Sequence, residues 1–248
     1  MKKIFLFIAF LWISLVSFAQ DGVNFEHLSF REALDKAKSE QKYVFMDCYT
    51  SWCGPCKNMT QNVFPQKKAG DYFNPKFICV KYDMEKGEGP ELGKRFEVRA
   101  YPTFLVLDAE GRLLHKVIGS YSVDEIIERI EESFDEEKAY GSLKAKYESG
   151  NREQVFMVKY LKMLIRYYDP AMEAVAAELI NNAERPLVLV GQGVELGNAQ
   201  QELRNFIEKA GIPAGCTLLG LSALPTDHPL NKGMLGMHGN LGPNINTN

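Results

Sequence analysis

The chain has 248 residues, of which 46% are hydrophobic and 25% charged, and its net charge is −3. That length suits one large domain or two small ones. No block of lysine or arginine marks a nucleic-acid surface, so we expect no nucleic-acid partner. Five cysteines are few for a disulfide scaffold of this length. Two of them form a C-x-x-C pair, which indicates redox or metal chemistry instead.

The first residues have the pattern of a secretory signal. Two lysines precede an apolar stretch from Ile4 to Val16, and the small residues Ser17 and Ala19 fit a signal-peptidase site. We therefore predict a signal peptide over 1–19 and an extracytoplasmic, periplasmic mature protein. The alternative is an uncleaved anchor. The apolar stretch is shorter than the roughly 20 residues that a spanning helix needs, so we expect no membrane span after cleavage.

Residues 24–135 carry the alternating periodicities of an α/β domain. Helical patterns cover 29–40, 53–68, 90–96 and 123–134, and short apolar runs typical of buried strands cover 43–48, 77–82, 103–107 and 113–118. The early β-α-β part predicts a parallel pair with a right-handed crossover. The turn at 108–111 predicts an antiparallel hairpin. We therefore expect a mixed central sheet flanked by helices.

A C-x-x-C pair lies where a predicted strand gives way to a helix, in the run Trp52-Cys53-Gly54-Pro55-Cys56-Lys57. The thiolate is the attacking species. Unpaired N–H groups and the positive end of the dipole at a helix N-terminus lower a thiol pKa to roughly 7 or below in such motifs. Cys53 occupies that position and is the predicted nucleophile. Cys56, one turn on, can attack the resulting mixed disulfide, and Pro55 has no N–H to leave unsatisfied in the first turn.

Two other interpretations of the C-x-x-C pair are open. It could be half of a zinc site, or an inert structural disulfide in a non-catalytic binding module. Structural zinc needs four ligands, and Cys48, Cys79 and the four histidines form no second ligand pair in the sequence. We therefore predict no metal site. Cys48 and Cys79 lie in apolar runs, where free thiols usually act as small buried hydrophobes.

The segment from about 28 to 135 resembles the thioredoxin family, because W-C-G-P-C-K is among the most specific signatures of that family. The resemblance implies a thioredoxin-like fold and a thiol–disulfide oxidoreductase that needs no cofactor. Asp47 matches a buried acid that helps to move the proton of the resolving thiol. Tyr101-Pro102-Thr103 matches the cis-proline loop, which packs against the disulfide and pairs with substrate. Catalytic roles thus fall on Cys53, Cys56, Asp47 and Pro102, and substrate contacts on Trp52, Tyr101 and Thr103.

Alternatives remain open for these matches. Asp47 could end its strand in solvent, and Pro102 could be trans. Lys81 matches a family lysine near the buried acid. The run from Asp47 to Cys53 also resembles modules of extracytoplasmic thiol–disulfide interchange proteins. That resemblance implies disulfide-bearing exported proteins and an upstream thiol reductant as partners. In this family, Gly-Pro between the cysteines favours reduction over strong oxidation.

Residues 136–169 are charged, with apolar residues at helical spacing from Met157 to Tyr168 and a break at Gly150-Asn151. We predict a helical hairpin appended to the redox domain. The hairpin is either a surface for a partner or a packing element without a role of its own.

The composition shifts at residue 170, after which glycine becomes frequent. An Ala-rich helix over 172–183 precedes a predicted strand over 187–190, a Gly-Gln-Gly turn, a helix over 197–210 and a strand near 216–218. This β-α-β order predicts a partial Rossmann-like α/β fold. A lone G-x-G turn is weak evidence for a nucleotide site.

Four motifs stand out in 170–248, namely R-P-L-V-L-V-G-Q-G-V, G-I-P-A-G-C-T-L-L-G-L-S-A-L-P, D-H-P-L and G-M-L-G-M-H-G-N. They resemble the central domain of acetolactate synthase, a thiamine-diphosphate enzyme, and in that family this domain binds FAD. The resemblance implies FAD contacts at Gly191, Gln192, Gly193, Thr217, Leu218, Leu235, Gly236, Met237 and His238. The family's catalytic acid and its diphosphate- and magnesium-binding motif have no counterpart here. We therefore expect an inactive fragment in a chimeric or truncated chain, with a reused binding module as the alternative.

Overall fold

The computed structural model describes residues 21–236 and 239. It divides into two compact units, Met1–Val175 and Ala176–Asn248. The predicted signal peptide lies outside the described residues, as do Met237 and His238, which were among the positions matched to FAD contacts. No helix in the described part of the chain is long and apolar enough to cross a membrane.

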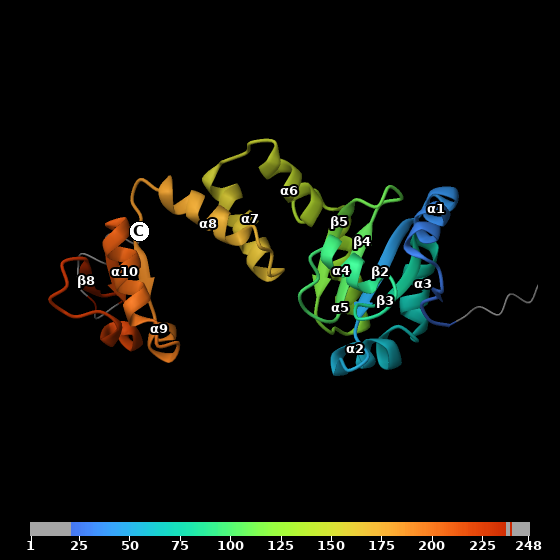
Figure 1. Cartoon of the computed structure of the whole chain (residues 1–248), viewed down its shortest axis with the longest axis horizontal. Helices are drawn as coiled ribbons and strands as arrows, with labels where there is room; N and C mark the ends of the chain where they lie inside the picture. Colours follow the sequence, from blue (N-terminus) through green and yellow to red (C-terminus); the bar gives the residue numbers. More distant parts are fainter. Residues whose placement is uncertain (1–20, 237–238, 240–248) are drawn as a thin grey trace, which may run out of the picture. The chain divides into compact units, whose positions relative to one another are not determined.

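The first unit is built around a five-stranded sheet (Figure 1). Its strands are β1 (Phe25–Glu26), β2 (Tyr43–Tyr49), β3 (Phe77–Asp83), β4 (Thr103–Leu107) and β5 (Leu113–Ile118), in the spatial order β1-β3-β2-β4-β5. Strands β1, β3 and β2 run parallel, whereas β4 runs antiparallel to both β2 and β5. The predicted parallel pair, antiparallel hairpin and mixed sheet are thereby confirmed.

Helices cover both faces of this sheet. They are α1 (Phe30–Glu40), α2 (Gly54–Asn58), the π-helical turn η1 (Met59–Val63), α3 (Lys67–Lys76), α4 (Gly89–Arg95), α5 (Val123–Glu131) and the 3-10 turn η2 (Glu132–Phe134). Side chains alternate between the two faces along a strand. Strand β2 therefore sends Phe45 to a core shared with η1, α3 and α5, and sends Val44 and Met46 to a second core shared with α1 and α4.

The first of these cores is dense in phenylalanine. Phe45 is fully buried, and its ring centroid lies 4.5 Å from that of Phe73 and 5.7 Å from that of Phe104. Aromatic pairs of this kind contribute about 0.5–1.5 kcal/mol each beyond their buried area. The core therefore holds the central strand against the helices that follow the C-x-x-C pair.

Two elements of the first unit differ from the sequence prediction. The helix predicted over 53–68 ends at Val63 as the turn η1, and α3 begins separately at Lys67. The reason is Pro65, which has no N–H to continue the hydrogen-bond ladder and whose ring crowds the preceding turn. Strand β1 has two residues, too few to produce a recognisable period.

The predicted helical hairpin is confirmed. Helices α6 (Tyr140–Glu148) and α7 (Gln154–Arg166) flank Gly150, whose φ of 94° is a conformation that favours glycine. The hairpin packs on β5. The Tyr140 N–H donates to Nδ1 of His115 over 3.2 Å, and the Tyr140 hydroxyl donates to Oδ2 of Asp169 over 2.6 Å. The first of these buried hydrogen bonds joins the hairpin to the sheet, and the second joins α6 to Asp169, which follows α7.

The second unit contains a three-stranded parallel sheet of β6 (Val188–Val190), β7 (Ala214–Cys216) and β8 (Asn231–Met234), in that order. Its other elements are α9 (Gly193–Leu196), α10 (Gln200–Ala210) and the 3-10 turn η3 (Leu218–Ala223), while α8 (Met172–Asn181) crosses the boundary between the units. The parallel β-α-β order is as predicted. The strand predicted near 216–218 ends at Cys216, because the chain turns into η3 at Leu218.

Replacing Phe45 by alanine tests the aromatic core. Loss of a fully buried phenylalanine typically costs about 3–5 kcal/mol, since burial is lost and a cavity remains. We expect Phe45→Ala to lower the free energy of unfolding by that amount, measured by urea titration followed through the fluorescence of Trp52. Phe134→Ala is the matched control, because Phe134 is 41% exposed and its loss should cost much less. Equal losses would contradict the assigned core.

Candidate redox site

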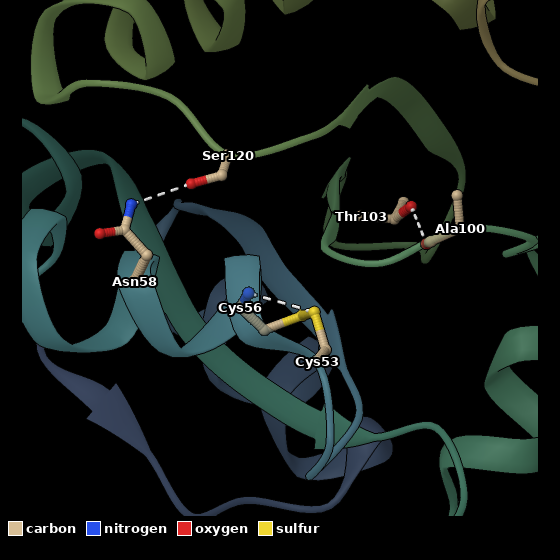
Figure 2. Close-up of a disulfide and its surroundings, with 6 residues drawn as sticks. All are labelled: Cys53, Cys56, Asn58, Ala100, Thr103 and Ser120. Atoms are coloured by element: carbon tan, nitrogen blue, oxygen red, sulfur yellow. Dashed lines mark hydrogen bonds between the residues drawn. A yellow bond between two sulfur atoms is a disulfide. The ribbon is translucent and has the colours of Figure 1, made fainter.

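The two cysteines of the C-x-x-C pair lie at the junction between β2 and α2 and form a disulfide, with their Cα atoms 5.3 Å apart (Figure 2). Cys53 caps the N-terminus of α2, and its sulfur accepts a hydrogen bond from the Cys56 N–H over 3.1 Å. The Cys53 N–H donates to the Thr50 carbonyl over 3.2 Å. When the pair is reduced, the Cys56 N–H and the helix dipole favour the thiolate form of Cys53.

The surface around the disulfide is exposed although the cysteines themselves are nearly covered. Cys53 and Cys56 are each 3% exposed, whereas Trp52 beside them is 64% exposed. The Trp52 Nε1–H donates to the Glu85 carboxylate over 2.9 Å. That hydrogen bond holds a large aromatic side chain in solvent next to the reactive sulfurs.

The predicted cis-proline loop is present. The Tyr101–Pro102 peptide bond is cis, so the trans alternative is wrong. Tyr101 packs edge-on against Trp52, with ring centroids 6.0 Å apart, which brings this loop to the C-x-x-C turn. The Thr103 hydroxyl donates to the Ala100 carbonyl over 2.8 Å (Figure 2), and the Pro102 carbonyl accepts from Gly119 N–H over 3.0 Å.

Asp47 is a buried carboxyl group in the middle of the sheet. It is 2% exposed, so the alternative that it ends its strand in solvent is wrong, and its Oδ1 has no hydrogen-bond partner among the described residues. Burial raises the pKa of Asp47 to about 7, and the charge of Lys81, its register partner on β3, acts in the opposite direction. Since side chains alternate along β2, Asp47 shares the face of Phe45, which is the face that η1 covers.

The remaining thiols of the first unit lie in surroundings that disfavour the thiolate form. Cys48 and Cys79 are buried and free, as predicted, and burial raises the pKa of each thiol. Within residues 21–236 and 239, no three or more His, Cys, Asp or Glu side chains gather where they could hold a metal ion. The structure thus gives no support to the zinc interpretation.

Several contacts of the site join residues that are distant in the sequence, so no local pattern could reveal them. They are Trp52 with Glu85, the Asn58 amide with the Ser120 hydroxyl at 3.1 Å, and the Tyr121 N–H with the Met59 sulfur at 3.3 Å. The last two tie the loop after β5 to α2 and η1, and Figure 2 shows the contact between Asn58 and Ser120.

In the second unit, the matched FAD positions that the structure describes follow the ends of three parallel strands. Gly191, Gln192 and Gly193 follow β6, Thr217 and Leu218 follow β7, and Leu235 and Gly236 follow β8. The Thr217 N–H donates to the Val190 carbonyl and the Leu235 N–H to the Cys216 carbonyl, both over 2.8 Å. These segments therefore lie together at the carboxyl edge of the sheet, where open α/β sheets bind ligands.

Comparison with known proteins assigns the two parts of the chain separately. Residues 30–133 match the model of the thioredoxin-like domain. Two solved structures are similar to this part. A candidate disulphide-isomerase from Bacteroides thetaiotaomicron is 43% identical, over 46% of this chain and 95% of that chain, with a TM-score of 0.43. A thioredoxin from Thermus thermophilus is 19% identical, over 46% and 89% respectively, with a TM-score of 0.42.

Residues 174–244 match the model of the central domain of thiamine pyrophosphate enzymes. The acetolactate synthase isozyme 1 large subunit of Escherichia coli is 50% identical over 64 residues, and the acetolactate synthase large subunit of Corynebacterium glutamicum is 47% identical over 64 residues. Each alignment covers 26% of this chain. The chain spans only 11% and 10% of the length of these two curated relatives.

The C-x-x-C disulfide at a helix N-terminus, together with the matching domain model, defines a thiol–disulfide oxidoreductase. Residues 30–133 belong to the thioredoxin-like domain family, and residues 174–244 are similar to the central domain of acetolactate synthase. The recognition of both parts from the sequence is confirmed.

Replacing Asp47 tests its burial. Because the pKa rises from 3.8 to about 7 on folding, the folded state holds this proton more tightly than the unfolded state. The contribution of this proton to the free energy of unfolding is complete below the pKa of Asp47 in the unfolded state. It is lost as the pH rises through the pKa of Asp47 in the folded state, by up to about 4 kcal/mol. We expect Asp47→Asn to match the wild type near pH 4 and to be more stable near pH 8, measured by urea titration of the oxidised proteins.

Asp35→Asn is the control for this experiment, because Asp35 is exposed on α1. It should show no gain in stability between the two pH values. If Asp47→Asn behaves like Asp35→Asn, the Asp47 carboxyl titrates as an ordinary surface group and its assignment as a buried acid is wrong.

Proposed function

We propose that the chain is a protein-disulfide reductase that acts outside the cytoplasm on exported proteins that contain disulfides. The observation that carries this proposal is the Cys53–Cys56 pair at the N-terminus of α2, next to the cis-Pro102 loop. The signal pattern of the first 19 residues supports export. The exposed Trp52 beside the disulfide supports contact with a macromolecular substrate.

Reduction proceeds in two exchange steps. The Cys53 thiolate attacks one sulfur of the substrate disulfide, which forms a mixed disulfide and releases the other substrate sulfur as a thiolate that takes up a proton. The Cys56 thiol then loses its proton and attacks the Cys53 sulfur. The second substrate sulfur leaves as a thiolate that takes up a proton, and the Cys53–Cys56 disulfide forms. Two electrons have passed from the cysteine pair to the substrate, and an upstream dithiol restores them by the reverse exchange.

Asp47 is the proposed acceptor of the Cys56 proton. A base is most effective when its pKa is near the working pH, and burial raises the pKa of Asp47 to about 7. Its Oδ1 lacks a hydrogen-bond partner among the described side chains, so a lone pair is free to accept. Lys81 stabilises the carboxylate after the proton has left, because its positive charge lies on the adjacent strand.

Substitution of each cysteine separates the two steps. We expect Cys53→Ser to reduce insulin disulfides no faster than dithiothreitol alone, because the attacking sulfur is gone. We expect Cys56→Ser to attack but not resolve, so that a mixed disulfide with the substrate accumulates on a non-reducing gel. Cys79→Ala removes a buried thiol outside the site and should retain wild-type activity.

A Cys53→Ser variant that keeps the wild-type rate would overturn the assignment of the nucleophile. A mixed disulfide that accumulates on Cys53→Ser rather than on Cys56→Ser would instead reverse the two roles.

A second candidate function concerns the second unit, and we infer that its sheet edge holds FAD. The residues that would hold it are those after the three strand ends, from Gly191 to Gly193, Thr217 and Gly236. At Gly191 and Gly193 an added Cβ would meet no atom within 4 Å, so this edge has open space for a ligand. A bound flavin would supply two-electron redox chemistry. The whole activity of acetolactate synthase is not proposed for this chain.

Flavin binding is measured by quenching of FAD fluorescence on titration with the protein. We expect saturable quenching, which the double substitution Gly191→Ala and Gly193→Ala should abolish, since the two methyl groups fill the open space without disturbing the fold. Gly54→Ala is the control, because it also faces open space but lies in the first unit. No saturable quenching by the wild type would remove this candidate, and equal effects of both substitutions would make the binding non-specific.

A further inference from the structure

A polar pocket lies in the first unit between β5, α5 and α7, away from the disulfide. Its lining includes His115, Arg129, Glu132, Arg166 and the rings of Tyr121 and Tyr167. The redox mechanism uses none of these residues. The pocket gathers two guanidinium groups and a histidine around a single carboxylate.

The histidine presents an unpaired donor to this pocket. His115 is 1% exposed, and its Nδ1 accepts the hydrogen bond of the Tyr140 N–H. In a neutral imidazole the other nitrogen then carries the hydrogen, and burial lowers the pKa of His115 to about 4, which keeps the ring neutral. The Nε2–H has no acceptor among the described residues. The nearby oxygen of Glu132 is 3.9 Å away, beyond hydrogen-bond distance.

Arg129 adds a second unpaired donor. Its Nε–H is buried without a partner among residues 21–236 and 239, and its guanidinium lies 4.3 Å from the centroid of the Tyr121 ring. Arg166 brings a further positive charge to the lining. A buried donor without an acceptor is destabilising, so two in one pocket point to an acceptor that the pocket binds.

We propose that this pocket binds a small anionic group, a phosphate or a carboxylate. Such a group supplies acceptor oxygens for the His115 Nε2–H and the Arg129 Nε–H at once. The two arginines carry two positive charges and Glu132 carries one negative charge, so the pocket has one positive charge left to balance the anion. Arginine suits this role because its planar fork matches the oxygens of phosphate and carboxylate.

Tyr121 links the pocket to η1, the helical turn that follows the cysteine-bearing helix α2. The backbone N–H of Tyr121 donates to the Met59 sulfur in η1, while its ring faces Arg129 in the pocket. The neighbouring Ser120 is bonded to Asn58 of α2 (Figure 2). A bound anion therefore contacts the loop that packs on the cysteine-bearing helix. The anion can be free in solution or an acidic group on a protein whose disulfide is exchanged.

Titration of the full chain with inorganic phosphate, followed by calorimetry at neutral pH and low salt, tests the proposal. We expect saturable binding. Loss of a charge-assisted hydrogen bond should weaken it about tenfold in Arg129→Gln and in Arg166→Gln. Glu132→Gln should bind several-fold more tightly, because it removes the opposing charge. Arg31→Gln, an exposed control on α1, should bind like the wild type.

A second measurement, by nuclear magnetic resonance, does not need the arginine variants and is therefore unaffected if they fail to fold. Phosphate should shift the Nε2–H resonance of His115 in the wild type and in Arg31→Gln. A short peptide rich in aspartate and glutamate then separates the two sources. If it displaces phosphate, the site takes an acidic group of a protein, and if it does not, the site takes a free anion. Absence of saturable phosphate binding, or equal affinities for Arg129→Gln and Arg31→Gln, overturns the proposal.

Discussion

Strand β2 is the constraint on which the redox site depends. It pairs with β3 on one side and with β4 on the other, so its position is fixed by two ladders of backbone hydrogen bonds. Its alternating side chains fill both cores. Because the strand cannot shift, the turn that follows it places Cys53 at the start of α2 in one orientation. The same register places Asp47 beside Lys81 and opposite Phe104.

Burial of Asp47 lowers stability at neutral pH and, in the proposed mechanism, suits its carboxyl group to take up a proton. A buried carboxyl group, one of whose oxygens lacks a hydrogen-bond partner among the described residues, is costly to ionise, and that cost moves its pKa toward neutrality. A well-solvated carboxyl would stabilise the fold at neutral pH, but it would hold its proton too weakly to serve a thiol. The aromatic core around Phe45 supplies stabilisation that offsets this cost.

The two compact units differ in how completely they bury their apolar residues. In the first unit, both faces of the sheet are covered by helices, and the hairpin α6–α7 adds a buried polar contact on β5. In the second unit, Leu189, Leu196, Leu218 and Leu219 are each more than 60% exposed. Exposed apolar side chains in such number usually mark a surface that contacts another molecule or another part of a protein. The Cys53–Cys56 disulfide lies in the first unit.

The redox class could be predicted from the amino-acid sequence alone, because C-x-x-C reactivity depends mainly on neighbouring residues at a strand–helix junction. The sequence also determined most helices and strands, since their apolar periods are local. The sequence analysis did not predict that the active-site helix ends at Val63, because the effect of Pro65 does not change the spacing of apolar residues. It also missed β1, because two residues are too few to show an alternating pattern. The burial of Asp47, the Trp52–Glu85 contact and the pocket around His115 became visible only in the folded structure. Each of these depends on side chains from different elements, whose distances are set by packing and not by spacing along the chain.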